Sequence, residues 1–336
     1  MRDKVISANI IETYKECSLA YGERSPIPIG IFIRDFYRHY HTINLVHRFA
    51  PLSTDTEILD VCAGFAVPSR ILQKEGYKIY VTDSYTIGGE AICSVTAKTF
   101  PFTRINNIET DKLPFSENSF DCVLWLGTIE HLQNSPKRVL DWIYKILRPN
   151  GIVVIDTPNI LELRKRIMLM LGKSFMPPIQ FVFHSNYHAD HHREYTKSDL
   201  EYVLQQSNFK ICYSGIVDTV SPISIERRTK IKDRIPEKSE LLQMTQFSIG
   251  WKVFSIDNLL KFPYSLALKL VPSFKDTLFI VGRKMYGKTG LINCGNAKAL
   301  RTMTDRVVHR GPGDSGIECF SESRVSVGYR RFSIDL

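Results

Sequence analysis

From Glu57 onward, the sequence alternates between short apolar runs rich in β-branched residues and stretches with helical apolar spacing. The apolar runs are EILDVC (57–62), YKIYVTD (77–83), FDCVLWL (120–126), GIVVIDT (151–157), FKICYSGIV (209–217) and DTLFIVGRK (276–284). Helical runs such as SRILQKEG (69–76) and SPKRVLDWIYKILRPNG (135–151) lie between them, and the second ends in a Pro-Asn-Gly stop signal. This alternation predicts an α/β fold with a mostly parallel sheet and helices on both faces.

The rest of the chain is organised around this central region. Residues 1–50 are expected to form N-terminal helices, and 51–285 to form the main domain. The alternation breaks at about 160–195, where ILELRKRIMLML (160–171) predicts an amphipathic helix and the apolar FMPPIQFVF (175–183) follows, so we expect a cap insertion there. Residues 286–336 are Gly-rich and weakly patterned, and we expect a poorly structured tail.

Composition narrows the class of protein. With 43% hydrophobic and 24% charged residues, the 336-residue chain matches ordinary soluble globular proteins and is not disordered throughout. The net charge of +9 favours an anionic partner or substrate, although residues 286–336 hold eight basic against five acidic residues and so carry a third of that excess. Seven scattered cysteines with no CxxC pair indicate reduced thiols and a cytoplasmic setting. No apolar run approaches the roughly 20 residues that span a bilayer, which leaves peripheral membrane contact open.

The segment ILDVCAGFAVPSRIL (58–72) is the most informative motif. It predicts a strand, a tight turn containing Asp60, Ala63, Gly64 and Ala66, and then a helix. Small residues at such a turn let the backbone approach a ligand, and the helix N-terminus offers unpaired N–H groups to it. Asp83 ends the next strand, where a carboxylate suits the two hydroxyls of a ribose.

Several motifs in chain order resemble those of class I S-adenosylmethionine-dependent methyltransferases. They are LDVCAGFA (59–66), Asp83, the LPF-containing stretch IETDKLPFSENSFDCVLWLGTIEHL (108–132), ILRPNGIVVIDTPN (146–159) and HHREYTKSDLEYVLQQSNFKI (191–211). The last resembles an HxREY segment found in a branch that modifies small molecules, sugars or lipids. The resemblance covers most of residues 45–285 and implies a Rossmann-like, seven-stranded, mostly parallel sheet. This chain departs from the family pattern at Cys62 and Ala66, where glycine is usual.

The resemblance also assigns roles to residues. It places Asp60, Ala63, Gly64, Ala66, Leu126 and Gly127 beside the methionine part of S-adenosylmethionine, Asp83 at the ribose, and Glu109 and Thr110 beside the adenine. An alternative for Asp60 is that its carboxylate organises the turn through hydrogen bonds.

Two histidines are the candidate bases. His131 follows the FDCVLWL run, the fourth strand by the family resemblance, where an open α/β sheet has its ligand cleft, and His191 aligns with the histidine of the HxREY segment. Arg193 and Tyr195 are the candidates for contact with the acceptor, although Arg193 could instead pair with a neighbouring carboxylate. A metal site among His184, His188, Asp190, His191 and His192 was considered, but their spacing matches no standard site, so no metal is expected.

The expected function is therefore transfer of a methyl group from S-adenosylmethionine, and O-methylation of a small metabolite, sugar or lipid-linked glycan fits best. The Arg164–Arg166 cluster would suit phosphates or an anionic membrane surface, unless the 160–171 helix is simply packed on the sheet edge. The substitutions at Cys62 and Ala66 keep a non-catalytic cofactor- or partner-binding role as the alternative. A nucleotide-dependent oxidoreductase is disfavoured because the turn lacks GxGxxG, and no nucleic-acid module is present.

Overall fold

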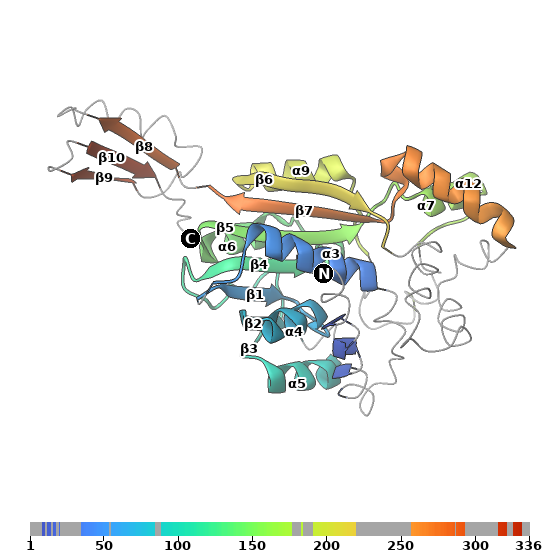
Figure 1. Ribbon diagram of the computed structural model, residues 1–336, viewed down its shortest axis with the longest axis horizontal. Helices are drawn as coiled ribbons and strands as arrows, with labels where there is room; N and C mark the ends of the chain where they lie inside the picture. Colours follow the sequence, from blue (N-terminus) through green and yellow to red (C-terminus); the bar gives the residue numbers. More distant parts are fainter. Residues whose placement is uncertain are drawn as a thin grey trace.

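A seven-stranded sheet forms the centre of the computed structural model (Figure 1). The structure describes residues 35–53, 55–84, 89–176, 191–219, 257–285, 287–292, 315–320 and 325–330, together with residue 183 and some positions between 9 and 20. The strands are β1 (Glu57–Val61), β2 (Lys78–Asp83), β3 (Phe102–Arg104), β4 (Phe120–Leu126), β5 (Leu147–Pro158), β6 (Phe209–Val217) and β7 (Thr277–Lys284). Their order is β3-β2-β1-β4-β5-β7-β6. The strand β7 runs antiparallel to both β5 and β6, and all other neighbouring strands pair in parallel. The expected Rossmann-like α/β fold is confirmed.

Helices lie on both faces of this sheet. They are α3 (Phe36–Phe49), α4 (Val67–Lys74), α5 (Gly89–Thr99), the short η1 (Ile129–His131), α6 (Lys137–Ile146), α7 (Leu163–Met170), α9 (Lys197–Gln206), α12 (Asp257–Leu270) and η3 (Pro272–Phe274). Figure 1 shows α7 and α12 together beyond the first residues of β7, and both helices contact η3.

The alternation of side chains along β5 explains why the sheet has two hydrophobic cores. Ile152 and Val154 point to one face, where they join a buried cluster with α3 and α4. Val153 and Ile155 point to the other face, where they join a cluster with α6 and α9. A strand buried on both faces is usually apolar along its whole length. The segment GIVVIDT follows this rule apart from its Asp and Thr. Those two polar residues therefore require partners inside the protein.

Two parts of the structure differ from the sequence expectation. Helix α6 ends at Ile146, and β5 begins at Leu147, four residues before the Gly151 at which the helical run was expected to stop. Residues 286–336 were expected to be poorly structured, yet β8 (Gly287–Ile292), β9 (Ser315–Phe320) and β10 (Val325–Arg330) form an antiparallel sheet in the order β8-β10-β9. The backbone ladder between these strands stabilises them without a strong apolar pattern. Of the cap insertion, residues 177–182 and 184–190 lie outside the described part.

Candidate functional site

The predicted site residues gather at the edge of the sheet where β1, β2, β4 and β5 have their carboxyl ends. These strands are parallel, so the turns that follow them meet along one edge. In open α/β sheets this edge is the usual place for a ligand.

The turn after β1 has an unusual backbone. Cys62, Gly64 and Ala66 all have positive φ angles, of 57°, 53° and 50°. Such a conformation is free for glycine but costs about 1–2 kcal/mol for other residues. Ala66 is also the N-cap of α4, which has Pro68 in its first turn. A Cβ atom on Gly64 would meet no other atom within 4 Å, so the backbone there borders open space.

Asp83, the last residue of β2, connects this turn to β2 through a hydrogen bond. Its Oδ2 accepts the Gly64 N–H at 2.6 Å, and its Oδ1 accepts the Ser84 N–H at 2.6 Å. Burial raises the pKa of Asp83, although both backbone hydrogen bonds act in the opposite direction. Each carboxylate oxygen keeps a further lone pair for a hydroxyl. The structure thus brings together Asp83 and Gly64, two of the residues predicted to bind the cofactor.

Asp60 has a partner inside the protein. Its side chain is buried, and its Oδ2 accepts a hydrogen bond from the Ser69 hydroxyl of α4 at 2.6 Å. Burial raises the pKa of Asp60 to about 7. The contact with Ser69 supports the alternative that Asp60 organises the turn.

An ion pair that the sequence analysis did not find lies beside Gly127. Asp156 of β5 is fully buried and receives two hydrogen bonds from Arg38 of α3, at 2.7 Å from Nε and 2.6 Å from Nη2. The Gly127 N–H donates to the same carboxylate at 2.7 Å. A Cβ on Gly127 would overlap the Arg38 guanidinium, so a side chain there would displace it. Burial alone would lower the pKa of Arg38, but Asp156 raises it.

The two predicted bases lie next to each other. His131 ends η1 and His191 comes from the HxREY segment; their ring centroids are 5.0 Å apart. His191 Nδ1 lies 2.9 Å from Glu194 Oε1. Burial alone would raise the pKa of Glu194, but hydrogen bonds from His191 and Lys165 lower it.

Glu130, which the sequence analysis did not single out, completes this cluster. Its side chain is buried, and its Oε2 accepts a hydrogen bond from the Thr157 hydroxyl at 2.9 Å. Burial raises the pKa of Glu130 to about 7. Its carboxylate lies with the His131 and His191 rings in a group of three potential metal-binding side chains, the one such group among the described residues.

Arg193 and Tyr195 are placed differently from each other. Arg193 is exposed, and its guanidinium carbon lies 5.5 Å from the centre of the Tyr195 ring. Tyr195 is buried, and its backbone forms an isolated bridge with Asn159. Arg193 can therefore meet a ligand, whereas the Tyr195 ring packs within the protein.

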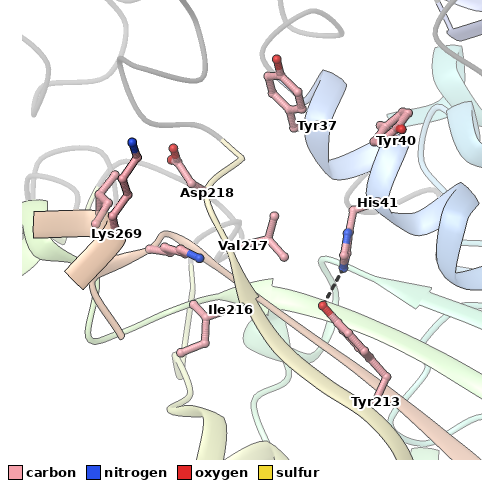
Figure 2. A pocket seen from close by; sticks show the side chains of 10 residues that line it. Tyr37, Tyr40, His41, Tyr213, Ile216, Val217, Asp218 and Lys269 are labelled. Carbon is pink, nitrogen blue, oxygen red and sulfur yellow. Dashed lines mark hydrogen bonds between the residues drawn. The ribbon is translucent and has the colours of Figure 1, made fainter. Parts of the chain in front are cut away.

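A cavity of about 660 Å³ opens between α3, the end of β6 and α12 (Figure 2). Figure 2 shows His41 pointing towards Tyr213, and the His41 Nε2 and Tyr213 hydroxyl are 3.0 Å apart. Burial lowers the pKa of His41 to about 4, so this imidazole is neutral near pH 7. The lining combines aromatic, apolar and charged side chains: Tyr37, Tyr40, His41, Tyr213, Ile216, Val217, Asp218, Leu268, Lys269 and Lys275.

The comparisons with known proteins place the chain in a family. Residues 35–214 match the family model described as "Methyltransferase domain", which is more than half of the chain. The chain belongs to the methyltransferase domain family. No curated protein matches its sequence.

Three solved structures similar to this methyltransferase domain are distant from it in sequence. One is a SAM-dependent methyltransferase from Archaeoglobus fulgidus (12% identity, TM-score 0.46, covering 76% of this chain and 99% of that one). Another is an S-adenosylmethionine-dependent methyltransferase from Mesorhizobium loti (13%, TM-score 0.44, 73% and 97%). A third is phosphoethanolamine N-methyltransferase 2 from Haemonchus contortus in complex with S-adenosyl-L-methionine (15%, TM-score 0.45, 82% and 56%). With TM-scores below 0.5, they say nothing about the activity of this chain.

Glu109 and Thr110 lie beside α6. They line a separate cavity of about 540 Å³ beside α6, together with residues such as Asn134 and Trp142. The Glu109 carboxylate accepts the Gln133 and Asn134 N–H groups at 3.2 and 2.6 Å. Glu109 therefore connects the loop between β3 and β4 to the loop between η1 and α6.

The basic cluster of α7 is used inside the protein. Arg164 pairs with Glu162, and the buried Lys165 pairs with Glu194. The Arg166 Nε donates to the Leu161 carbonyl at 2.7 Å, and its guanidinium lies over the Phe274 ring of η3. This arrangement favours the interpretation that α7 packs on the fold over a phosphate-binding role. No helix among the described residues is long and apolar enough to cross a membrane.

Proposed function

We propose that this chain transfers a methyl group from S-adenosylmethionine to an oxygen atom of a small metabolite, sugar or lipid-linked glycan. One observation carries the proposal: the turn with Gly64 and Asp83 and the His131–His191 pair lie at the same edge of a methyltransferase-domain sheet. The open space beside Gly64 and the spare lone pairs of Asp83 fit a cofactor that carries a ribose.

Several residues at this edge would bind and orient the cofactor. S-adenosylmethionine supplies an electrophilic methyl group on a sulfonium, so the protein has mainly to bind, orient and exclude water. Asp83 would accept hydrogen bonds from the ribose hydroxyls, and the backbone at Gly64 and Gly127 would border the rest of the cofactor. The charges of Asp83 and Asp156 raise the pKa of Asp60, and the Arg38 guanidinium lowers it, so several carboxylates lie within electrostatic reach of one another here. Negative charge there favours a cationic cofactor over its neutral product.

A histidine would take the proton of the acceptor hydroxyl. The contact between His191 Nδ1 and Glu194 leaves Nε2 as the nitrogen that can face a substrate. His131 lies against the same ring and could serve instead.

The cavity in Figure 2 would hold the acceptor. Tyr37, Tyr40 and Tyr213 offer ring faces with polar ends, and Lys269 and Lys275 offer positive charge for a phosphate or carboxylate. Exposed apolar side chains on the neighbouring helices would suit a lipid-linked acceptor; they include Leu169, Met170, Leu266 and Leu270. The five described cysteines are free thiols, which agrees with a cytoplasmic location.

Calorimetry with S-adenosylmethionine and S-adenosylhomocysteine tests the cofactor. We expect binding by the wild type and a loss of about tenfold or more in Asp83→Asn. Asp121→Asn changes a carboxylate at the opposite edge of the sheet and should leave affinity unchanged. Thermal unfolding of both variants separates loss of contact from loss of fold. Absence of binding at millimolar ligand would overturn the proposal; mass spectrometry of extracts incubated with isotopically labelled cofactor would identify the acceptor.

The backbone at Cys62 and Ala66 favours one second candidate, a non-catalytic binding module. Both residues hold a left-handed conformation that the family normally gives to glycine. If cofactor affinity has been lost through these substitutions, the double variant Cys62→Gly and Ala66→Gly should gain it. Equal affinity in wild type and double variant would argue against this candidate.

A further inference from the structure

Three potential metal ligands converge beside the proposed methyl-transfer site. Glu130 and His131 belong to η1, and His191 lies sixty residues later in the chain. One ligand atom from each lies within 4.8 Å of the other two. Ligand atoms on one transition-metal ion are at most about 4.4 Å apart, because metal–nitrogen and metal–oxygen distances are about 2.0–2.2 Å. The three groups would close on an ion with movements below about 1 Å.

Two of these side chains, those of Glu130 and His191, are held in place by the surrounding protein. The Glu130 side chain is buried, its Oε2 accepts the Thr157 hydroxyl, and its backbone carbonyl accepts the His192 N–H at 2.8 Å. The contact with Glu194 occupies the Nδ1 of His191, and the buried Lys165 holds Glu194 in turn. A carboxylate behind a ligating histidine is the usual way in which proteins orient such a ligand.

We propose that Glu130, His131 and His191 bind one divalent transition-metal cation. Two imidazole nitrogens and one carboxylate oxygen suit Zn²⁺, Co²⁺, Fe²⁺ or Mn²⁺ better than Mg²⁺, which prefers oxygen ligands. Three protein ligands also leave coordination positions open for a substrate. This proposal differs from the expectation, drawn from the spacing of the histidines at 184–192, that no metal is bound.

The role of this cation, unlike its binding, rests on the proposed function. An acceptor hydroxyl bound at an open position would lose its proton to water more readily, because a divalent cation stabilises the alkoxide. The oxygen–carbon bond then forms as the carbon–sulfur bond of the sulfonium breaks, and that electron pair stays on sulfur. His131 and His191 would act as ligands in this case, and the cation would take over the activation of the hydroxyl.

Titration of the metal-free, tag-free full chain with Co²⁺ tests the site. We expect one equivalent to bind, with visible absorption bands characteristic of a nitrogen- and oxygen-ligated Co²⁺. Glu130→Gln and His191→Ala should each weaken binding by about 100-fold, and Glu194→Gln by about 10- to 100-fold. His192→Ala is the matched control, because this neighbouring side chain is exposed and is not one of the three ligands. Circular dichroism confirms that each variant is folded.

The outcomes separate this inference from the proposed function. Cofactor binding by calorimetry without any Co²⁺ binding at millimolar concentration would overturn the metal site and leave the proposed function intact. Co²⁺ binding that persists in both Glu130→Gln and His191→Ala would overturn it as well. Co²⁺ binding that is lost in these two variants and kept in His192→Ala supports the metal site, even if the protein binds no S-adenosylmethionine.

Discussion

Single residues at the sheet edge carry buried ionisable groups, and ionising them lowers the stability of the folded protein, so this stability depends on pH. Asp60 is the clearest example, because its carboxylate is buried against α4 and has a pKa of about 7 in the folded protein. The unfolded value lies near 4, so the native state binds more protons between about pH 4 and pH 7. Stability is therefore highest below this window and falls as the pH rises through it.

Asp60→Asn should remove this pH dependence. The free energy of unfolding of the wild type, relative to the variant, should fall between pH 5 and pH 8, by at most about 3 kcal/mol. Urea denaturation at the two pH values measures the difference. Ser69→Ala is a useful companion, because loss of a hydrogen bond that favours the ionised carboxylate should extend the decline to higher pH. Parallel pH profiles for wild type and Asp60→Asn would contradict the prediction.

Among the elements, α3 is anchored to the sheet through one ion pair. Arg38 reaches Asp156, 118 residues later in the chain, and the Asp156 side chain has no exposed surface. Removing one partner of a buried pair leaves the other uncompensated, which costs more than the pair itself contributes. The contact fixes both α3 and the Gly127 backbone.

Arg38→Met should lower the free energy of unfolding by about 3–5 kcal/mol. Lys74→Met is the matched control: its ion pair with Glu16 has nearly the same length, 2.7 Å, but is exposed, and its loss should cost less than about 1 kcal/mol. The double variant Arg38→Met and Asp156→Leu should recover much of the loss, because neither member of the pair is then left buried without its partner. Urea denaturation of all three measures these values, and equal effects of Arg38→Met and Lys74→Met would contradict the interpretation.

The elements that could be predicted from sequence are those with strong local patterns. Six strands were expected because each is an apolar run rich in β-branched or aromatic residues, whereas β3 is only three residues long, too short to show a strand pattern. The site divides in the same way. The Gly64 turn and Asp83 follow from a local motif, and His131 and His191 from the family resemblance. Arg38, Asp156 and Glu130 were missed because their partners are distant in sequence; the signal was acidic residues within apolar segments.

At the scale of the whole molecule, the chain divides into a methyltransferase domain and a small terminal sheet. The strands β8, β10 and β9 pair with one another, and Figure 1 shows them set apart from the central sheet. Sequence patterns did not reveal them because glycines such as Gly290 and Gly328 interrupt short strands. The central sheet is complete without them, since β7 ends at Lys284 and the Tyr144 hydroxyl donates to the Met285 carbonyl at 2.8 Å.

Deletion of residues 287–336 should therefore leave the methyltransferase domain folded. We expect the midpoint of thermal unfolding to change by less than about 2 °C, because the deletion removes no strand of the seven-stranded sheet. Deletion from residue 277 is the control: it also removes β7, which pairs with β5 on one side and β6 on the other, and it should abolish cooperative unfolding. Calorimetry with S-adenosylmethionine on the shorter deletion extends the test to function. A large loss of stability after removal of 287–336 would show that the terminal sheet is part of the same folding unit.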